Sequence, residues 1–239
     1  MDALRRQFDR RLFLTAAVLF PLIVFAGFAR TYYLRGFFQV PPLPSTIVHL
    51  HGLVMTLWVA VFVIQVRLIA AKQVQLHKQL GYASIGLAAL IIGTGLPTAM
   101  RAAKFGSTST PVDVPPLSFM LIPVMDLVMF AIFFGAAIIY RRRPADHKRL
   151  MLLTAINFIP PAIARIPIPA LQALGPLWFF GFPTAIALLC VVLDARRQGR
   201  VNRMFVLGTM LLLVSYVARI ALMGTQAWIN VATWLITFV

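Results

Sequence analysis

Four histidines are the side chains of this chain best suited to bind a metal or a haem. His49 and His51 lie in the segment VHLHG, whereas His77 and His147 each precede a lysine. Neutral imidazole is a common ligand of haem iron and of other metals. His77 and His147 are expected at the ends of two different helices and at the same depth, so they are candidate ligands of one haem b. The alternative is that each histidine caps its helix and meets lipid headgroups.

His49 and His51 open an apolar stretch directly and form a second candidate pair. Residues two apart on a helix point about 200° away from each other, so the two rings do not face one ligand from a regular helix. As an extended pair they could hold copper or zinc through two nitrogens, but two ligands make only half of such a site. A structural role is the alternative, and the sequence defines no complete metal site.

Three charged residues are expected inside apolar helices, where charge is costly and is usually paired or functional. Asp126 lies within SFMLIPVMDLVMFAIFFG, and Arg165 and Arg219 lie near the ends of two later apolar stretches. All three are predicted in the same half of the bilayer. They could form a ligand, proton or quinone site, with Asp126 as the proton-active group and the arginines binding anionic or carbonyl oxygens. The alternative is a buried ion pair that locks two helices together.

Several classes of enzyme are excluded by what the sequence lacks. The chain has no Glu, a single cysteine (Cys190), no glycine-rich phosphate loop and no HExxH segment. One carboxylate within an apolar helix cannot support paired-carboxylate catalysis. The catalytic residues, if the protein is an enzyme, are therefore not identified by sequence.

Composition places these side chains in a membrane protein. The 239 residues are 61% hydrophobic and only 12% charged, and the mean hydropathy is +0.89. Soluble domains carry roughly 25% charged residues. A transmembrane helix needs about 20 apolar residues, and the chain offers seven such stretches, near residues 12–30, 48–70, 80–100, 117–140, 149–166, 176–195 and 204–223. The predicted fold is a single all-α integral membrane domain over residues 1–239, a bundle of about seven transmembrane helices.

Charge distribution predicts the orientation of this bundle. The net charge is +16, with 22 Lys and Arg against six acids. Sixteen of the 22 fall on one side if the N-terminus is cytoplasmic, as expected of inner loops that also meet anionic lipids. These clusters flank apolar stretches rather than forming one stripe, which argues against a nucleic-acid partner. We expect a multi-pass protein of a bacterial cytoplasmic membrane, with a short interfacial helix over residues 225–239 on the outer face.

Five sequence blocks carry a resemblance to a known family. They are FARTYYLR at 28–35, VHLHG at 48–52, LHKQLG at 76–81, DHKRLM at 146–151 and AIARIP at 162–167. Together they resemble a family of bacterial inner-membrane proteins, which implies about seven helices and assigns no activity. The histidines at helix ends are more distantly similar to membrane di-haem cytochromes of the ascorbate-reducible b type. Those proteins place ligand pairs on both sides, and this chain lacks a clean outer pair on separate helices.

Three classes of function follow from these features. The first is haem- or quinone-linked electron transfer, with the polar site in the outer half of the bilayer. The second is a non-catalytic accessory subunit of a larger respiratory or photosynthetic complex, which requires partner membrane subunits. The third is a small-molecule carrier or binding protein that uses the outer polar pocket.

Overall fold

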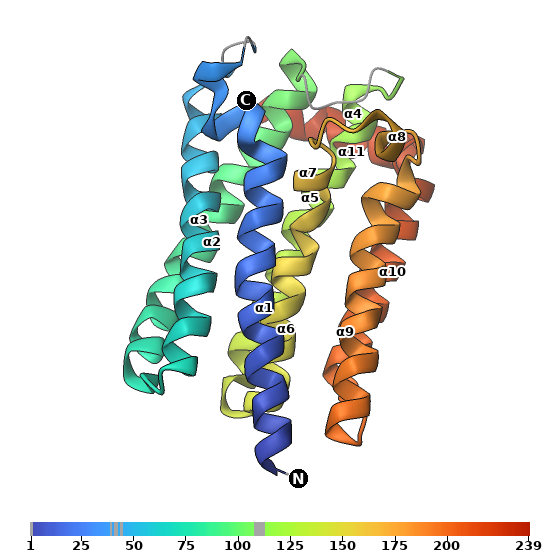
Figure 1. Ribbon diagram of the computed structural model, residues 1–239. Coiled ribbons are helices and arrows are strands. Elements are labelled where there is room, and N and C mark those ends of the chain that lie inside the picture. The colour runs from blue at the N-terminus through green and yellow to red at the C-terminus, as the bar shows by residue number, and fades with distance from the viewer. Residues whose placement is uncertain (1, 39, 41–42, 44, 108–112) are drawn as a thin grey trace.

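The chain folds into a bundle of helices (Figure 1). The computed structural model describes residues 2–38, 40, 43, 45–107 and 113–239, with the backbone alone described for residues 2–6. The protein is 86% helical, and no strand forms within the described residues. The long helices are α1 (Asp2–Phe28), α2 (Thr46–Ala70), α3 (Val74–Phe105), α5 (Leu121–Ile139), α6 (Pro144–Asn157), α9 (Phe182–Gln198) and α10 (Arg203–Leu222).

Shorter elements extend or connect these helices. Two π-helical turns, η1 (Ala29–Tyr33) and η4 (Leu177–Gly181), lie at the end of α1 and the start of α9. The others are η2 (Arg35–Phe37), α4 (Pro116–Phe119), η3 (Tyr140–Arg142), α7 (Ile159–Ile163), α8 (Pro169–Gln172), α11 (Gln226–Leu235) and η5 (Ile236–Phe238).

Six helical segments are long and apolar enough to cross a membrane, counted over the described residues. They are Gln7–Tyr33, Thr46–Ala70, Val74–Phe105, Pro116–Arg142, Leu177–Gln198 and Arg203–Leu222. Each overlaps one of the seven predicted stretches. The remaining prediction, 149–166, is met by two shorter helices, α6 and α7, which the residue Phe158 separates.

Two consecutive prolines explain this break. Proline has no amide hydrogen to donate to the preceding turn, but it is tolerated at the first positions of a helix. Pro160 and Pro161 occupy such positions at the start of α7, and the amide of Phe158 closes the end of α6 on the carbonyl of Ala155 at 3.1 Å. The chain then continues in the same direction, with α7 beyond α6 along the bundle (Figure 1).

The α6–α7 segment lies at the centre of the bundle. All residues from Leu152 to Pro160 are buried, and α6 contacts α1, α5, α9 and α10. A helix that is apolar and enclosed on all sides needs partners on every face. Close contact with α1 is possible because Gly27 has no side chain: a Cβ there would lie 2.1 Å from the carbonyl oxygen of Ala162.

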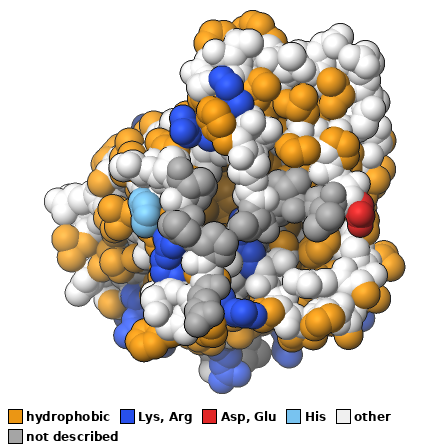
Figure 2. All heavy atoms as spheres, turned by 90° about the horizontal axis from the view of Figure 1, so that it is seen from above, with side chains coloured by type: hydrophobic (Ala, Val, Ile, Leu, Met, Phe, Trp, Pro, Cys, Tyr) orange, Lys and Arg blue, Asp and Glu red, His pale blue; other side chains and the backbone are white. Residues whose placement is uncertain are grey.

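The turns predicted to be cytoplasmic gather at one end of the bundle, together with residue 2 (Figure 1). We call this the basic end; it holds the turns at 71–73, 140–143 and 199–202. At the opposite end, the far end, α11 packs on α4, and Trp228 Nε1 donates to the carbonyl of Leu117 at 2.8 Å. Figure 2 looks down on the far end and shows basic side chains scattered among apolar ones. The short helix that is expected over residues 225–239 corresponds to α11 and η5.

Candidate functional site

A buried ion pair between α5 and α10 is the centre of the candidate site. Nη1 of Arg219 donates to Oδ1 of Asp126, and the two side chains are 0% and 5% exposed. Asp126 lies early in α5 and Arg219 in the last turn of α10, so both belong to the half of the bundle nearer the far end. The structure thus brings together two of the three charged residues that the sequence predicts at this depth.

Several polar atoms next to this pair lack a hydrogen-bond partner among the described residues. They are Nε and Nη2 of Arg219, the hydroxyl of Tyr216 and Oδ1 of Asn157, all of them buried. Asn157 Nδ2 donates to the backbone carbonyl of Asp126 at 2.9 Å, and the Tyr216 ring lies 5.1 Å from the Arg219 guanidinium carbon. We call Asp126, Asn157, Tyr216 and Arg219 the Arg219 cluster. Buried polar groups normally have a hydrogen-bond partner. Several unpaired polar atoms in one place therefore indicate a binding site for a ligand.

The unpaired edge of Arg219 has a defined chemical preference. Nε–H and Nη2–H point to the same side of a guanidinium and match two oxygen acceptors. Arg149 uses the same edge in this protein: its Nε and Nη2 both bind the carboxylate of Asp194, with the Nε contact at 2.8 Å. Arg219 binds its own carboxylate through Nη1 instead, which leaves the two-donor edge available.

Aromatic side chains cover the cluster. The Phe180 ring stacks on Tyr216 with centroids 4.7 Å apart and planes 26° from parallel, and it lies 5.9 Å from the Arg219 guanidinium carbon. Phe180 belongs to the π-helical turn η4. Such turns are rare and occur often at functional sites. The cluster is therefore closed in this structure, with an irregular segment as its cover.

Arg165 does not join the Asp126–Arg219 pair, which departs from the predicted three-residue site. It lies beyond the end of α7, where its Nη1 donates to the carbonyl of Pro161 and its guanidinium carbon lies 4.7 Å from the Phe28 ring. Because the chain turns after α7, Arg165 is directed toward α1 rather than toward α5 and α10.

His49 and His51 diverge, as their spacing predicts. His49 is exposed, and its backbone carbonyl accepts a bond from the Tyr32 hydroxyl at 3.1 Å. His51 is half-buried, and its Nδ1 lies 3.0 Å from the Thr94 hydroxyl on α3. The centroid of the His49 ring lies 6.4 Å from that of the Tyr32 ring, so the two histidine rings have different neighbours.

His77 and His147 lie side by side at the basic end. Their ring centroids are 6.2 Å apart and the planes are nearly perpendicular, at 83°. His147 Nδ1 lies 2.8 Å from the carbonyl oxygen of Ala137, so this nitrogen donates a hydrogen bond to it. Nδ1 of His77 is buried without a partner among the described residues. The predicted equality of depth is present.

No group of three or more metal-binding side chains (His, Cys, Asp or Glu) occurs in the described part of the chain. No protein-family model, curated protein or solved structure matches the sequence. The site must therefore be interpreted from its own chemistry.

Sequence reasoning missed two members of this site and one structural partner. Tyr216 precedes Arg219 by three residues and so shares its helix face, a spacing that could have identified it. Nothing in the sequence around Asn157 indicates its contact with the Asp126 backbone. Asp194 is buried against Arg149, a contact between residues 45 positions apart that the sequence does not indicate.

Proposed function

We propose that the protein is a multi-pass protein of a bacterial cytoplasmic membrane with its N-terminus inside and seven crossings. Six apolar helices support the membrane placement. Residues 144–163 of α6 and α7 together extend roughly 30 Å at 1.5 Å per residue, the thickness of a bilayer core. The concentration of basic turns at one end supports the orientation, because cytoplasmic loops are enriched in Lys and Arg.

We further propose that the Arg219 cluster binds a neutral carbonyl-bearing molecule, a membrane quinone being the class that the bilayer supplies. The observation that carries this proposal is the free two-donor edge of Arg219 inside the bundle. Oxygen acceptors complement that edge and the Tyr216 hydroxyl. The stacked rings of Phe180 and Tyr216 provide flat apolar surfaces suited to a ring system.

Charge balance favours a neutral ligand over an anion. Asp126 already neutralises Arg219, so a bound carboxylate would add an uncompensated charge in an apolar interior, where such a charge is costly. A quinone carbonyl accepts the same hydrogen bonds without that cost. Asp126, adjacent to the bound oxygen, is the proton-active group of the site. Entry of the ligand requires Phe180 and η4 to move.

The test is organic extraction of the protein purified in detergent, with quinones quantified by liquid chromatography and mass spectrometry. Arg219→Lys keeps a cation opposite Asp126 but removes the two-donor edge. We expect this variant to remain folded and to lose most of the bound quinone. Tyr216→Phe should lower retention less. Arg101→Lys, at the far end outside the cluster, is the matched control and should retain the wild-type amount.

The competing hypothesis is an ion pair that only locks α5 to α10. Under that hypothesis, wild-type extracts contain no more quinone than those of an unrelated membrane protein prepared in parallel. Asp126→Asn and Arg219→Lys would then change only the melting temperature, and the proposed ligand site would be rejected.

A second candidate, one haem b between His77 and His147, rests on the geometry of the two rings. The ring centroids lie 6.2 Å apart, and the two rings come from different helices. A hydrogen bond from the second ring nitrogen to a carbonyl, as in His147, is typical of metal ligands.

Visible spectra of the oxidised and dithionite-reduced protein, expressed with ample haem supply, test this candidate. A reduced α-band that is lost in His77→Ala and His147→Ala supports it, and a flat spectrum rejects it. A stoichiometric partner subunit in the same preparation would favour the accessory-subunit alternative.

A further inference from the structure

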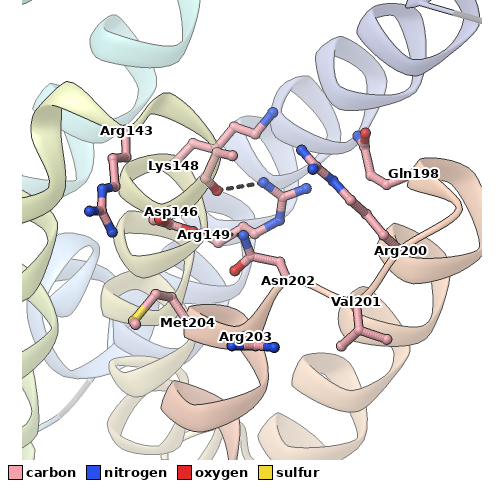
Figure 3. Close-up of a pocket in the computed structure, with 11 residues that line it drawn as sticks. Arg143, Asp146, Lys148, Arg149, Gln198, Arg200, Val201, Asn202, Arg203 and Met204 are labelled. Atoms are coloured by element: carbon pink, nitrogen blue, oxygen red, sulfur yellow. Dashed lines mark hydrogen bonds between the residues drawn. The ribbon is translucent and has the colours of Figure 1, made fainter.

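A cavity of about 610 Å³ opens at the basic end, between the start of α6 and the turn that joins α9 to α10. Five cationic side chains line it (Figure 3): Arg143, Lys148, Arg149, Arg200 and Arg203. It lies at the opposite end of the bundle from the Arg219 cluster.

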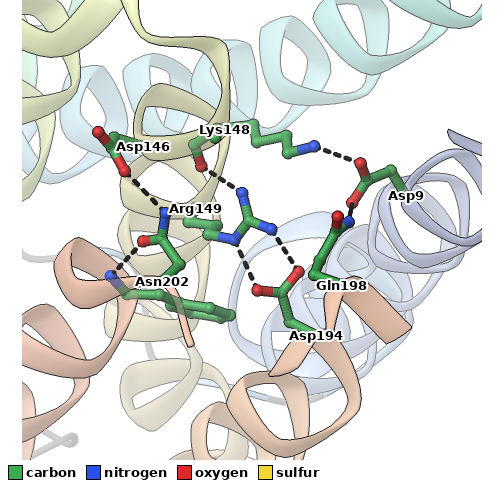
Figure 4. A network of polar contacts seen from close by, with 9 residues as sticks. Asp9, Asp146, Lys148, Arg149, Asp194, Gln198 and Asn202 are labelled. Atoms are coloured by element: carbon green, nitrogen blue, oxygen red, sulfur yellow. Dashed lines mark hydrogen bonds and ion pairs between the residues drawn. The ribbon is translucent and has the colours of Figure 1, made fainter. Parts of the chain in front are cut away.

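The carboxylates near this cavity are already engaged. Asp146 accepts a hydrogen bond from Asn202 Nδ2 at 2.7 Å. Asp194 is held by Arg149, and Asp9 by the ammonium group of Lys148. These contacts connect α6 with α1, with α9 and with the turn before α10 (Figure 4). Five cations against these three carboxylates leave a net charge of +2 around the cavity.

Arg143, Arg200 and Arg203 form no ion pair with any acidic side chain that the structure describes. All three are exposed. Gly199 has a left-handed backbone (φ 67°) and ends α9, so the chain reverses there and brings Arg200 to the rim of the cavity. Arg203 begins α10 and borders the same cavity.

Two helix N-termini add to the positive potential. α6 begins at Pro144 and α10 at Arg203, and residues of both first turns border the cavity. The N-terminal end of a helix carries a partial positive charge and binds anions. Arginine guanidinium groups bind phosphate oxygens through two parallel hydrogen bonds. Cationic side chains and helix ends therefore converge on one concave surface.

We infer that this cavity binds a phosphate group, supplied either by the headgroup of an anionic phospholipid or by a soluble phosphate compound. Phosphate offers several acceptor oxygens and a negative charge that offsets the net +2 of the lining. This site goes beyond the proposed carbonyl site and does not depend on it. A phosphate bound there bridges α6 and the α9–α10 turn.

The test compares two double variants with equal loss of charge. Arg200→Gln/Arg203→Gln removes the two exposed arginines that the α9–α10 turn and the start of α10 contribute to the cavity. Arg196→Gln/Arg197→Gln removes two exposed arginines of α9 that do not line it. Isothermal titration calorimetry in detergent at low ionic strength measures binding of two probes, short-chain phosphatidylglycerol below its micelle concentration and inorganic phosphate.

We expect wild type and Arg196→Gln/Arg197→Gln to bind with similar affinity. Arg200→Gln/Arg203→Gln should bind at least about tenfold more weakly, because it loses charge-assisted hydrogen bonds to phosphate. The melting temperatures without probe should agree, because neither pair is buried. Lipid and phosphate competing for one site assigns the lipid headgroup as a source. Phosphate binding without lipid binding assigns a soluble compound. Equal weakening in both double variants, or no binding of either probe, overturns the inference.

Discussion

The Asp126–Arg219 pair shows what a charged residue requires in this interior. Either charge alone, at 5% or less exposure, would carry a desolvation penalty of several kcal/mol that only a partner offsets. The pair engages one nitrogen of Arg219 and leaves the other two without partners among the described residues. A purely structural pair would gain most from a two-donor contact of the kind that Arg149 makes with Asp194. The incomplete pairing at Arg219 is therefore the strongest residue-scale argument for a ligand.

Gly27 is the residue whose replacement should disturb packing most directly. In Gly27→Ala the new Cβ would meet the Ala162 carbonyl at 2.1 Å, so α1 and α7 must separate. We expect a loss of about 2–3 kcal/mol in the free energy of unfolding, seen as a lower melting temperature by tryptophan fluorescence in detergent.

Gly93→Ala is the control for this prediction. A Cβ at Gly93 on α3 meets no atom within 4 Å, so this variant should be neutral or slightly stabilising, by up to about 1 kcal/mol. Equal melting temperatures for the two variants would show that α1 and α7 are not in contact as described.

The positions of Asp126 and Arg219 along their apolar stretches predicted that the two lie at the same depth in the bilayer. Opposite charges at one depth on neighbouring helices are expected to form a pair. The same reasoning wrongly placed Arg165 with this pair, because it treated residues 149–166 as one straight helix. The prolines end α6 at Asn157, and the backbone direction after α7 decides where Arg165 points. The spacing of residues in the sequence does not reveal the direction of the backbone after α7.

At the scale of elements, the basic end is held together by ionic contacts of unequal burial. Arg149 and Asp194 are 5% and 3% exposed, whereas Lys148 and Asp9 are 29% and 21% exposed. Both contacts start from α6, one reaching α9 and the other α1 (Figure 4). The buried contact therefore determines how firmly α9 is attached to the central helix.

Asp194→Ala should destabilise the protein far more than Asp9→Ala. Loss of Asp194 leaves a buried guanidinium without its counter-charge, at a cost of about 3–5 kcal/mol. Loss of the partly exposed Asp9 should cost less than about 1 kcal/mol. Chemical denaturation followed by tryptophan fluorescence measures both, and comparable losses in the two variants would contradict the assigned burial.

The positions of six long helices were predictable because a bilayer core requires about 20 apolar residues in each, although α1 begins earlier than predicted and α3 extends past both predicted ends. Pro160 and Pro161 indicate a break in the helix near Phe158, but they do not indicate which contacts the residues at the break make. Only the packed structure shows that Asn157, at that break, reaches the backbone of Asp126. Likewise, the π-helical form of η4 has no signature in the sequence that periodicity could detect.

For the whole molecule, the distribution of charge and the direction of the chain agree. The basic turns lie at the end that holds residue 2, and α11 lies at the other (Figure 1). If only the six long apolar helices ran through the bundle, the number of passages would be even. Both ends of the chain would then lie at the same end of the bundle. The chain ends at the far end because α6 and α7 provide one further passage through the centre. Composition predicted this passage as an ordinary span, whereas the structure makes it the most enclosed element of the bundle.

Site-directed labelling tests this topology directly. In a Cys190→Ala background, single cysteines replace Arg141 at the basic end and Leu174 at the far end, on either side of α6–α7. We expect a membrane-impermeant maleimide added to intact spheroplasts to label Leu174→Cys, which replaces a side chain 50% exposed. Arg141→Cys should react only after the membrane is permeabilised, because the proposed orientation, which follows the positive-inside rule, puts its turn in the cytoplasm. Labelling of both cysteines from the same side would show that α6–α7 does not cross. Labelling of Arg141→Cys alone would keep the crossing and reverse the orientation.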